Sequence, residues 1–208
     1  MNACVAAPDP HWSAWRRRLY WWRHDPAEAE ELVSLDLETT SLDPRKADIL
    51  SIGAVVIRHG KLILGERLEL LVEPPLSLDG ESIRIHKLRR ADLEGQLPLA
   101  EALRRVQAFV GERPLLGYYL SFDVAVLRRH LREQLGARLD NPRVEVSEIY
   151  HRKMSRRFPD LHLDLRFDTL ARNLEIPIEG RHTAIGDART AALMFLRLRK
   201  GSLPRDLS

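Results

Sequence analysis

Two acidic residues near the end of an alternating segment are the first candidates for chemistry. Asp36 and Glu38 lie in residues 31–38, where apolar and polar residues alternate as they do in a β-strand. Residues two apart on a strand point to the same face, so both carboxylates project together. Like charges on a buried face repel and are costly to desolvate unless a cation lies between them, and Mg²⁺ prefers oxygen ligands. For this pair alone, a hydrated strand end is the alternative interpretation.

Two further groups could complete such a site. Asp123 lies in the first turn of an expected helix, where the helix dipole favours an acid in any protein. His182 and Asp187 lie at the start of the last expected helix and could converge on one pocket. Small residues in that segment would let its backbone approach a sheet closely: Ala184, Gly186 and Ala188. A neutral imidazole can accept a proton near neutral pH, although a capping or surface role is the alternative for a lone histidine.

Three expected strands must position the first pair of acids. They cover residues 31–38, 49–58 and 61–73, and His59 with Gly60 forms a hairpin turn between the second and the third. The second segment is almost continuously apolar, which is typical of a central strand. Three consecutive strands therefore open the domain.

Helices and strands alternate in the rest of the chain. The expected elements are a helix over 97–110, a short strand over 113–118, and helices over 121–135, 165–174 and 183–200. Ser121 and Thr183 are the expected N-caps, and Gly136 and Gly201 the expected stops. Three strands followed by α/β alternation imply a mixed sheet with helices on its faces.

The first 30 residues differ from the rest in composition. All four tryptophans lie here, interleaved with arginines, and Trp12, Trp15 and Trp22 fall near one face of a predicted helix. Docking of that face on the core is the favoured interpretation, and binding to a protein partner or a membrane surface is the alternative. We therefore expect an N-terminal Trp- and Arg-rich helical extension over 1–30 and a catalytic domain over 31–208.

Length and composition favour a cytoplasmic protein of one ordinary domain. The chain has 208 residues, of which 44% are hydrophobic and 30% charged, a globular balance. No apolar run is long enough to span a bilayer, and the start lacks the pattern of a signal peptide. The single cysteine, Cys4, has no partner for an internal disulfide.

Charge permits a polyanionic partner without establishing one. The chain carries 33 basic and 30 acidic residues, a net charge of +3 and a pI near 9.2, whereas binding to phosphates needs a local patch. Residues 128–160 hold nine Lys or Arg against five Asp or Glu. A solvated helix face and a nucleic-acid track explain this run equally well.

The order and placement of the acidic groups resemble the DEDDh branch of the DnaQ-like exonucleases, whose members include the proofreading subunit of bacterial replicative polymerase and RNase T. The resemblance covers roughly residues 31–200: Asp-x-Glu ends the first strand, Phe-Asp starts a mid-chain helix and His-x4-Asp starts the last one. Residues 36–42 are similar to the family's first motif and residues 167–170 to its Asp-Thr helix. Glu81 and His86 match a substrate-contacting pair of the proofreading subunits.

This resemblance implies a ribonuclease H-like fold with a mixed five-stranded sheet flanked by helices. It also implies a 3′→5′ exonuclease that uses two divalent cations, Mg²⁺ or Mn²⁺, acts on the 3′ end of single-stranded nucleic acid and releases nucleoside 5′-monophosphates. The implied metal ligands are Asp36, Glu38, Asp123 and Asp187. His182 would accept the proton of the attacking water, and Thr40 and Leu42 would lie beside the terminal base.

Departures from the family's pattern concern the handling of substrate. Tyr118 and Tyr119 stand where the family usually has His-Asn, and Ser41 replaces a common glycine. The tyrosines could stack on bases or narrow the cleft. DNA is the favoured substrate. The alternatives are RNA trimming, as in RNase T-like or oligoribonuclease-like proteins, and an interaction module with little activity that binds a protein through its tryptophan helix.

Overall fold

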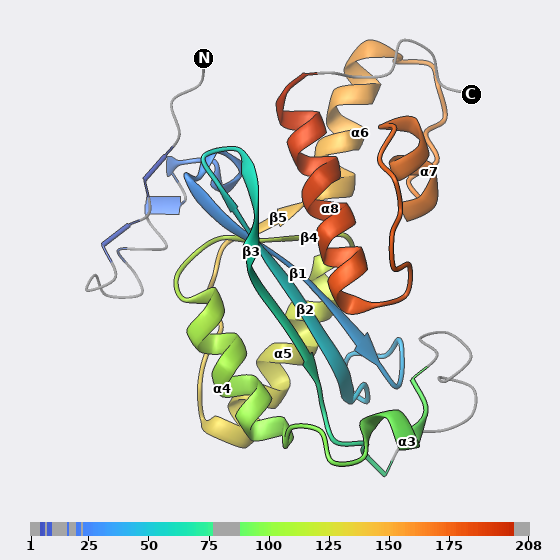
Figure 1. Cartoon of the computed structure of the whole chain (residues 1–208). Coiled ribbons are helices and arrows are strands. Elements are labelled where there is room, and N and C mark those ends of the chain that lie inside the picture. The colour runs from blue at the N-terminus through green and yellow to red at the C-terminus, as the bar shows by residue number, and fades with distance from the viewer. Residues whose placement is uncertain are drawn as a thin grey trace.

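Five strands form one mixed sheet at the centre of the molecule (Figure 1). A computed structural model describes residues 5, 6, 8, 9, 16, 20, 21, 23–76 and 88–201. The strands run in the order β3-β2-β1-β4-β5. Antiparallel pairing joins the first three, and β4 and β5 continue the sheet in parallel with β1. Their bounds are Glu31–Thr39 for β1, Ile49–Arg58 for β2, Lys61–Leu71 for β3, Leu115–Gly117 for β4 and Arg143–Glu145 for β5.

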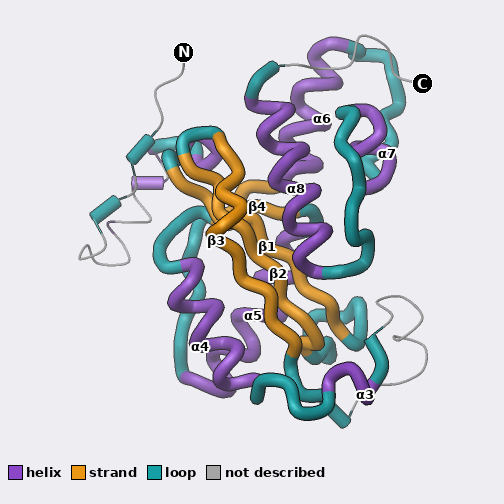
Figure 2. Tube along the Cα trace, in the orientation of Figure 1, coloured by secondary structure: helices purple, strands orange, loops and turns teal. Residues whose placement is uncertain are grey.

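Helices cover both faces of this sheet (Figures 1 and 2). One face packs against α4 and α5 and the other against α6, α7 and α8. The helices are η1 (Pro26–Glu28), α3 (Arg90–Leu93), α4 (Leu99–Val110), α5 (Leu120–Leu135), α6 (Val146–Arg157), α7 (Phe167–Asn173) and α8 (Ala184–Arg199). The expected mixed five-stranded sheet with flanking helices is confirmed.

Alternation along β1 separates two hydrophobic cores. Val33, Leu35 and Leu37 are buried in the core beneath α4 and α5, whereas Leu32 belongs to the core beneath α6 to α8. Successive strand residues point to opposite faces. Asp36 and Glu38 therefore lie on the face of Leu32, the face that α8 covers.

The predicted turn between β2 and β3 is also present. His59 and Gly60 have φ values of 48° and 68°, and a two-residue hairpin turn of type I′ requires positive φ at both positions. Most other boundaries differ from the predicted ones by one to three residues, as helix and strand ends commonly do.

The predicted N-cap of α5 was wrong. The helix begins at Leu120, and Tyr119 is its N-cap in a left-handed conformation. The Glu145 carboxylate accepts hydrogen bonds from the backbone N–H groups of Tyr119 at 3.1 Å and Leu120 at 2.9 Å. A side chain distant in sequence thus replaces Ser121, which lies inside the first turn.

Four elements were not predicted: η1, α3, β5 and α6. The last two lie within the basic segment 128–160, where charge obscures the apolar pattern. Three buried residues of α6, Ile149, Tyr150 and Met154, anchor that helix to the core. At the start of α6, Glu145 also accepts a hydrogen bond from the Ser147 N–H at 3.2 Å.

Six residues named above lie outside those described: Cys4, Trp12, Trp15, Trp22, Glu81 and His86. Trp21 is described, and its partly buried ring packs against the core beneath α6 to α8. In the described part of the chain, no helix combines the length and apolar character needed to cross a membrane.

Candidate active site

Three carboxylates from two distant segments meet where β1 ends beneath the start of α8. Asp36 and Glu38 project from β1, and Asp187 lies in the first turn of α8. One carboxylate oxygen from each residue lies within 4.8 Å of those of the other two. We call these three residues the acid cluster. The register of β1 shifts between Glu38 and Thr39, and such irregularities re-aim side chains beside functional sites.

A glycine on β2 allows α8 to come this close to the sheet. Gly53 is paired with Asp36 across the β1–β2 ladder. A Cβ atom at Gly53 would lie 2.1 Å from the carbonyl carbon of Ala184, the first residue of α8. The buried hydroxyl of Ser34 also donates to the Ala188 carbonyl at 2.7 Å, which ties β1 to the same helix. The position of Asp187 therefore depends on direct contact between helix and strand.

The start of α8 is capped as the sequence predicts. The Thr183 hydroxyl accepts a hydrogen bond from the Gly186 N–H at 3.2 Å and donates one to the Gly180 carbonyl at 2.6 Å. A Cβ atom at Gly186 would lie 2.2 Å from that same carbonyl oxygen. The turn before α8 is thereby held against the helix, and it carries the residues that surround Asp187.

Asp123 lies beside the acid cluster. It is in the first turn of α5 and only 4% exposed. Among the neighbouring charges, that of Asp123 has the largest effect in raising the pKa of Asp36. Burial raises the pKa of Asp123 itself well above the ordinary value, against the opposing effect of the Leu37 backbone N–H. The structure thus brings the fourth predicted acid next to Asp36.

The surroundings of the acid cluster disfavour ionised carboxylates. Burial raises the pKa of Asp36 well above its ordinary value, and the surrounding carboxylates raise it further. Burial and the charge of Asp187 raise the pKa of Glu38 to about 7. Burial also raises the pKa of Asp187, although a nearby arginine opposes this effect. Like charges that share a site disfavour each other's ionisation, so the ionised carboxylates of this site repel one another.

That arginine is Arg181, which the sequence analysis missed. Its guanidinium forms ion pairs with Asp187 at 2.5 Å and Asp168 at 2.9 Å. The guanidinium carbon also lies 4.4 Å from the centre of the Phe167 ring, a cation–π distance. The available signal was a basic residue directly before His182 in a motif rich in acids. Arg181 connects the start of α7 to the acid cluster.

His182 lies at the edge of the cluster. Its backbone N–H donates to Asp187 Oδ2 at 3.3 Å, and its Nδ1 atom lies 3.5 Å from a terminal nitrogen of Arg181. The residue is partly buried and has a φ of 63°. This left-handed backbone, uncommon for a residue other than glycine, turns the chain directly into the cap of α8.

The predicted substrate contacts have different surroundings. Leu42 and Tyr119 are 84% and 71% exposed, so each presents an apolar surface to solvent. The Thr40 hydroxyl accepts a hydrogen bond from the Asp48 N–H at 3.0 Å. The Tyr118 hydroxyl donates to the Leu165 carbonyl at 3.0 Å, and its ring packs edge-on against that of Phe167. Leu42 and Tyr119 are available for contact, whereas Tyr118 is already engaged.

The acid cluster has the donor set of a divalent cation site. All its candidate ligands are carboxylate oxygens, which Mg²⁺ and Mn²⁺ favour. Within the part of the chain that is described, the buried Asp187 Oδ1 atom has no hydrogen-bond partner. An unpaired buried oxygen is costly, and a bound cation would satisfy it. Asp36, Glu38 and Asp187 therefore fit a metal ion.

Comparison with known proteins places the chain among exonucleases. The model of the RNase T exonuclease family matches residues 33–195. A DNA polymerase III subunit epsilon-like protein of Rhodobacter capsulatus is 33% identical over 83% of the chain and 24% of that protein. DNA polymerase III subunit epsilon of Aquifex aeolicus is 26% identical over 80% of the chain and 79% of its own length.

Other relatives are much longer than this chain. It is 25% identical over 81% of its length to the PolC-type DNA polymerase III of Clostridium perfringens, of which it spans 11%. Among solved structures, E. coli exonuclease I in complex with a dT13 oligonucleotide superposes with a TM-score of 0.69 at 17% identity, over 80% of this chain and 40% of that one. This likeness supports the ribonuclease H-like fold.

Proposed function

The chain belongs to the RNase T exonuclease family and is therefore a nuclease, and on that premise we propose that it removes nucleotides from the 3′ end of single-stranded DNA. The products are nucleoside 5′-monophosphates, and two divalent cations, Mg²⁺ or Mn²⁺, are the cofactors. We further propose that residues 31–208 are the exonuclease domain, that residues 1–30 are an extension able to contact a protein partner, and that the protein is cytoplasmic.

One observation carries this proposal: the acid cluster joins two segments about 150 residues apart in the sequence, with Asp123 beside it. Buried like charges destabilise a fold when no cation compensates them. Arg181 forms an ion pair with Asp187. The other oxygen of the Asp187 carboxylate has no hydrogen-bond partner among the described residues. A site of this kind is suited to cations that bind a phosphodiester.

Four carboxylates are the proposed ligands of the two cations. Asp36 would contribute to both metal sites, Glu38 and Asp187 would complete one of them, and Asp123 would support the second. When bound, divalent cations provide a nucleophile at neutral pH and neutralise charge on the phosphate. Arg181 keeps Asp187 in place through its ion pair.

His182 is the proposed general base. A water molecule attacks the phosphorus in line with the terminal P–O3′ bond, that bond breaks, and the proton of the water passes to the imidazole of His182. The position of His182 beside Asp187 supports this role. A well-placed general base contributes a factor of about 10²–10⁴ to the rate.

Substrate contacts are proposed at the edge of this site. Exposed Leu42 lies beside the terminal base together with Thr40, and Tyr119 provides a surface for stacking. Tyr118, Glu81 and His86 are further proposed contacts. The preference for DNA is supported by the names of the relatives, which are DNA polymerase III proteins, and by the oligonucleotide bound to E. coli exonuclease I.

RNA trimming is the second candidate, because the matching family is named after RNase T. Parallel digestion of DNA and RNA oligonucleotides of the same sequence separates the two. A function mainly in binding a protein partner is the third candidate, and it predicts no hydrolysis of either.

The test is digestion of 5′-labelled single-stranded DNA and RNA with Mg²⁺ or Mn²⁺. We expect a ladder that shortens from the 3′ end and disappears with EDTA. Asp36→Ala should lower the rate on the order of 10³-fold or more, since charge stabilisation by the cations is worth several kcal/mol. Asp160→Ala removes an exposed acid outside the site and is the matched control. Unchanged activity of Asp36→Ala with an unchanged melting temperature would refute the proposal.

A further inference from the structure

A hollow lined by four arginines lies along the exposed side of α5. It has a volume of about 260 Å³. We call it the arginine groove, and its lining residues are Ser121, Val124, Ala125, Arg128, Arg129, Arg132 and Arg143. No Asp or Glu of the described residues belongs to this lining. The groove is thus a concave surface of one charge sign.

Three of the four guanidinium groups form no ion pair with a described carboxylate. The Arg128 Nε–H donates to the Leu139 carbonyl at 2.7 Å, and an Arg143 N–H donates to the Ser121 hydroxyl at 3.5 Å. Arg132 is exposed, and its side chain forms no hydrogen bond or ion pair with the described residues. Each of these three charges is therefore available to an anion.

Arg129 has a structural role. It forms an ion pair with Glu133 at 3.4 Å and donates to the Pro44 carbonyl at 3.2 Å. These contacts attach α5 to the loop after β1. The anion-binding capacity of the groove thus rests on the three remaining arginines.

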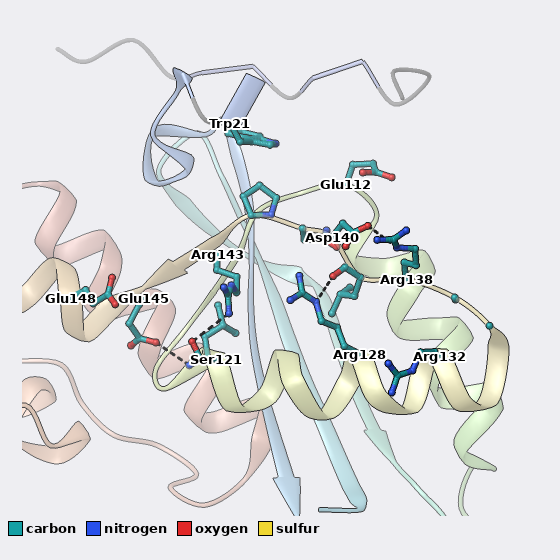
Figure 3. A pocket seen from close by; sticks show the side chains of 16 residues that line it. Trp21, Glu112, Ser121, Arg128, Arg132, Arg138, Asp140, Arg143, Glu145 and Glu148 are labelled. Atoms are coloured by element: carbon teal, nitrogen blue, oxygen red, sulfur yellow. Dashed lines mark hydrogen bonds and ion pairs between the residues drawn. The ribbon is translucent and has the colours of Figure 1, made fainter. Parts of the chain in front are cut away.

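Two elements bring these arginines together. Arg128 and Arg132 lie one turn apart on the same side of α5, and Arg143 reaches toward Ser121 from β5 (Figure 3). Like charges spaced four residues apart on a helix destabilise it. A bound anion would relieve this repulsion, and guanidinium groups match the geometry of phosphate oxygens.

A larger cleft of about 1250 Å³ adjoins the groove and shares Ser121, Arg128, Arg132 and Arg143 with it (Figure 3). None of the acid cluster lines this cleft. Four acids also line it: Glu112, Asp140, Glu145 and Glu148. These acids lie on the cleft side of the shared arginines, whereas the lining of the arginine groove holds none of them.

The groove and the acid cluster lie on opposite sides of the first turn of α5. Ser121 at one end of the groove is exposed, whereas Asp123 beside the acid cluster is buried, and residues two apart on a helix do not face each other. Arg132 lies nine residues beyond Asp123, which is roughly 13 Å along a helix axis. A strand whose 3′ end lies at the acid cluster would therefore pass around the start of α5 and then extend along its exposed side.

We propose that the arginine groove binds the phosphodiester backbone of single-stranded nucleic acid, 5′ to the nucleotide being removed. This inference rests on the proposed function and adds a binding site to it. The contacts are to phosphates, so the groove contributes affinity without reading sequence.

Binding of a fluorescein-labelled single-stranded oligonucleotide in EDTA, measured by anisotropy over a range of salt concentrations, tests the groove. The triple variant Arg128→Gln, Arg132→Gln and Arg143→Gln removes three phosphate contacts. The slope of log K against log salt should then become shallower by about 2, at roughly 0.7 for each contact with a single strand. At 0.1 M salt this corresponds to a loss of affinity of about 100-fold.

A control variant loses the same charge elsewhere. Arg67→Gln, Arg104→Gln and Arg105→Gln replace exposed residues of β3 and α4, and this variant should bind with nearly the wild-type slope. Equal slopes for the two triple variants would refute the groove, because the effect would then be one of net charge. If the first triple variant does not fold, Arg132→Glu alone tests the proposal, since that exposed side chain forms no hydrogen bond or ion pair with the described residues. An unchanged slope for Arg132→Glu would likewise overturn it.

Two further measurements separate this proposal from its rivals. Binding of polyglutamate as tightly as the oligonucleotide would overturn it in favour of an acidic protein partner. Nuclease activity of the wild-type protein tests the proposed function independently. A wild-type protein that digests DNA while the groove variant binds with the wild-type slope would refute the groove alone, and a protein that binds through the groove but hydrolyses nothing would refute the proposed function alone.

Discussion

The carboxylates of the acid cluster are only partly compensated by the protein. Arg181 is bound directly to Asp187, whereas burial and mutual repulsion raise the pKa values of Asp36 and Glu38. At neutral pH the folded state therefore bears a cost that the unfolded state, with its hydrated carboxylates, does not. Protons or cations can relieve this cost, and the two should compete.

The first prediction at this scale concerns the pH dependence of stability. The pKa of Glu38 is raised from an ordinary 4.5 to about 7, so the folded state holds a proton that the unfolded state has released between these pH values. Stability of the metal-free protein should therefore fall as pH rises from about 5 to about 7. Thermal melting in EDTA should show a smaller fall for Glu38→Gln, at about 2–4 °C per kcal/mol for a domain of this size. Parallel curves for the two proteins would contradict the raised pKa.

The second prediction concerns His182. If its imidazole accepts the proton of the attacking water, His182→Ala should lower kcat by a factor of about 10²–10⁴. Affinity for an oligonucleotide in EDTA should change little, because the role is specific to the transition state. Single-turnover rates and anisotropy measure the two quantities separately, with His151→Ala, an exposed histidine on α6, as control. A loss confined to affinity would remove the general-base role.

Among the contacts between elements, the one between α8 and β2 sets how close Asp187 comes to the acids of β1. Helix α8 carries Asp187, and its first residue lies directly over Gly53, which is paired with Asp36. Any side chain at Gly53 would push the helix away from the strand. The distance between the acids of β1 and the acid of α8 is thus fixed by the absence of one Cβ atom.

Replacement of Gly53 tests this arrangement. The Cβ atom of Gly53→Ala would lie 2.1 Å from the backbone of Ala184, so α8 must shift, at a cost of about 3 kcal/mol or more. We expect the melting temperature to fall by roughly 6–12 °C, together with weaker metal binding. Gly65→Ala is the matched control, because nothing lies within 4 Å of a Cβ atom there. Similar melting curves for the two variants would show that the close approach is unimportant.

In the molecule as a whole, the candidate active site lies where the sheet meets a helix from each of its two faces. Asp36 and Glu38 belong to the sheet, Asp187 to a helix on one face and Asp123 to a helix on the other. A cation held among them would connect all three layers, and a ligand that binds only the folded state stabilises it. Metal binding should therefore be measurable as global stability.

Thermal melting with added Mn²⁺ checks this expectation. At pH 7.5 a metal concentration 100 times its Kd should add about 2.7 kcal/mol to the stability of the wild-type protein. At pH 5 the gain should shrink, because the Glu38 carboxyl, whose pKa is raised to about 7, then holds a proton that competes with the metal ion. Asp187→Asn should lose most of the gain, whereas Asp160→Asn should retain it. Equal stabilisation of Asp187→Asn would place the cation elsewhere.

Local chemistry in the sequence determined much of this picture. Alternation predicted that Asp36 and Glu38 share a face of β1, because side-chain direction on a strand depends only on residue parity. Thr183 was recognised as the cap of α8, since a hydroxyl just before a helix satisfies a free N–H group. The mixed sheet with helices on both faces also followed from the order of the elements.

Only the tertiary structure decided which distant groups meet. Arg181 is paired with Asp187 inside the acid cluster, Glu145 caps α5 in place of Ser121, and Gly53 admits α8 to the sheet. Each contact joins side chains or backbone whose partners are chosen by packing, and periodicity and local propensity hold no information about packing. The sequence therefore named the acids and their elements, and the folded chain determined their separation, their compensating charge and the groove on the exposed side of α5.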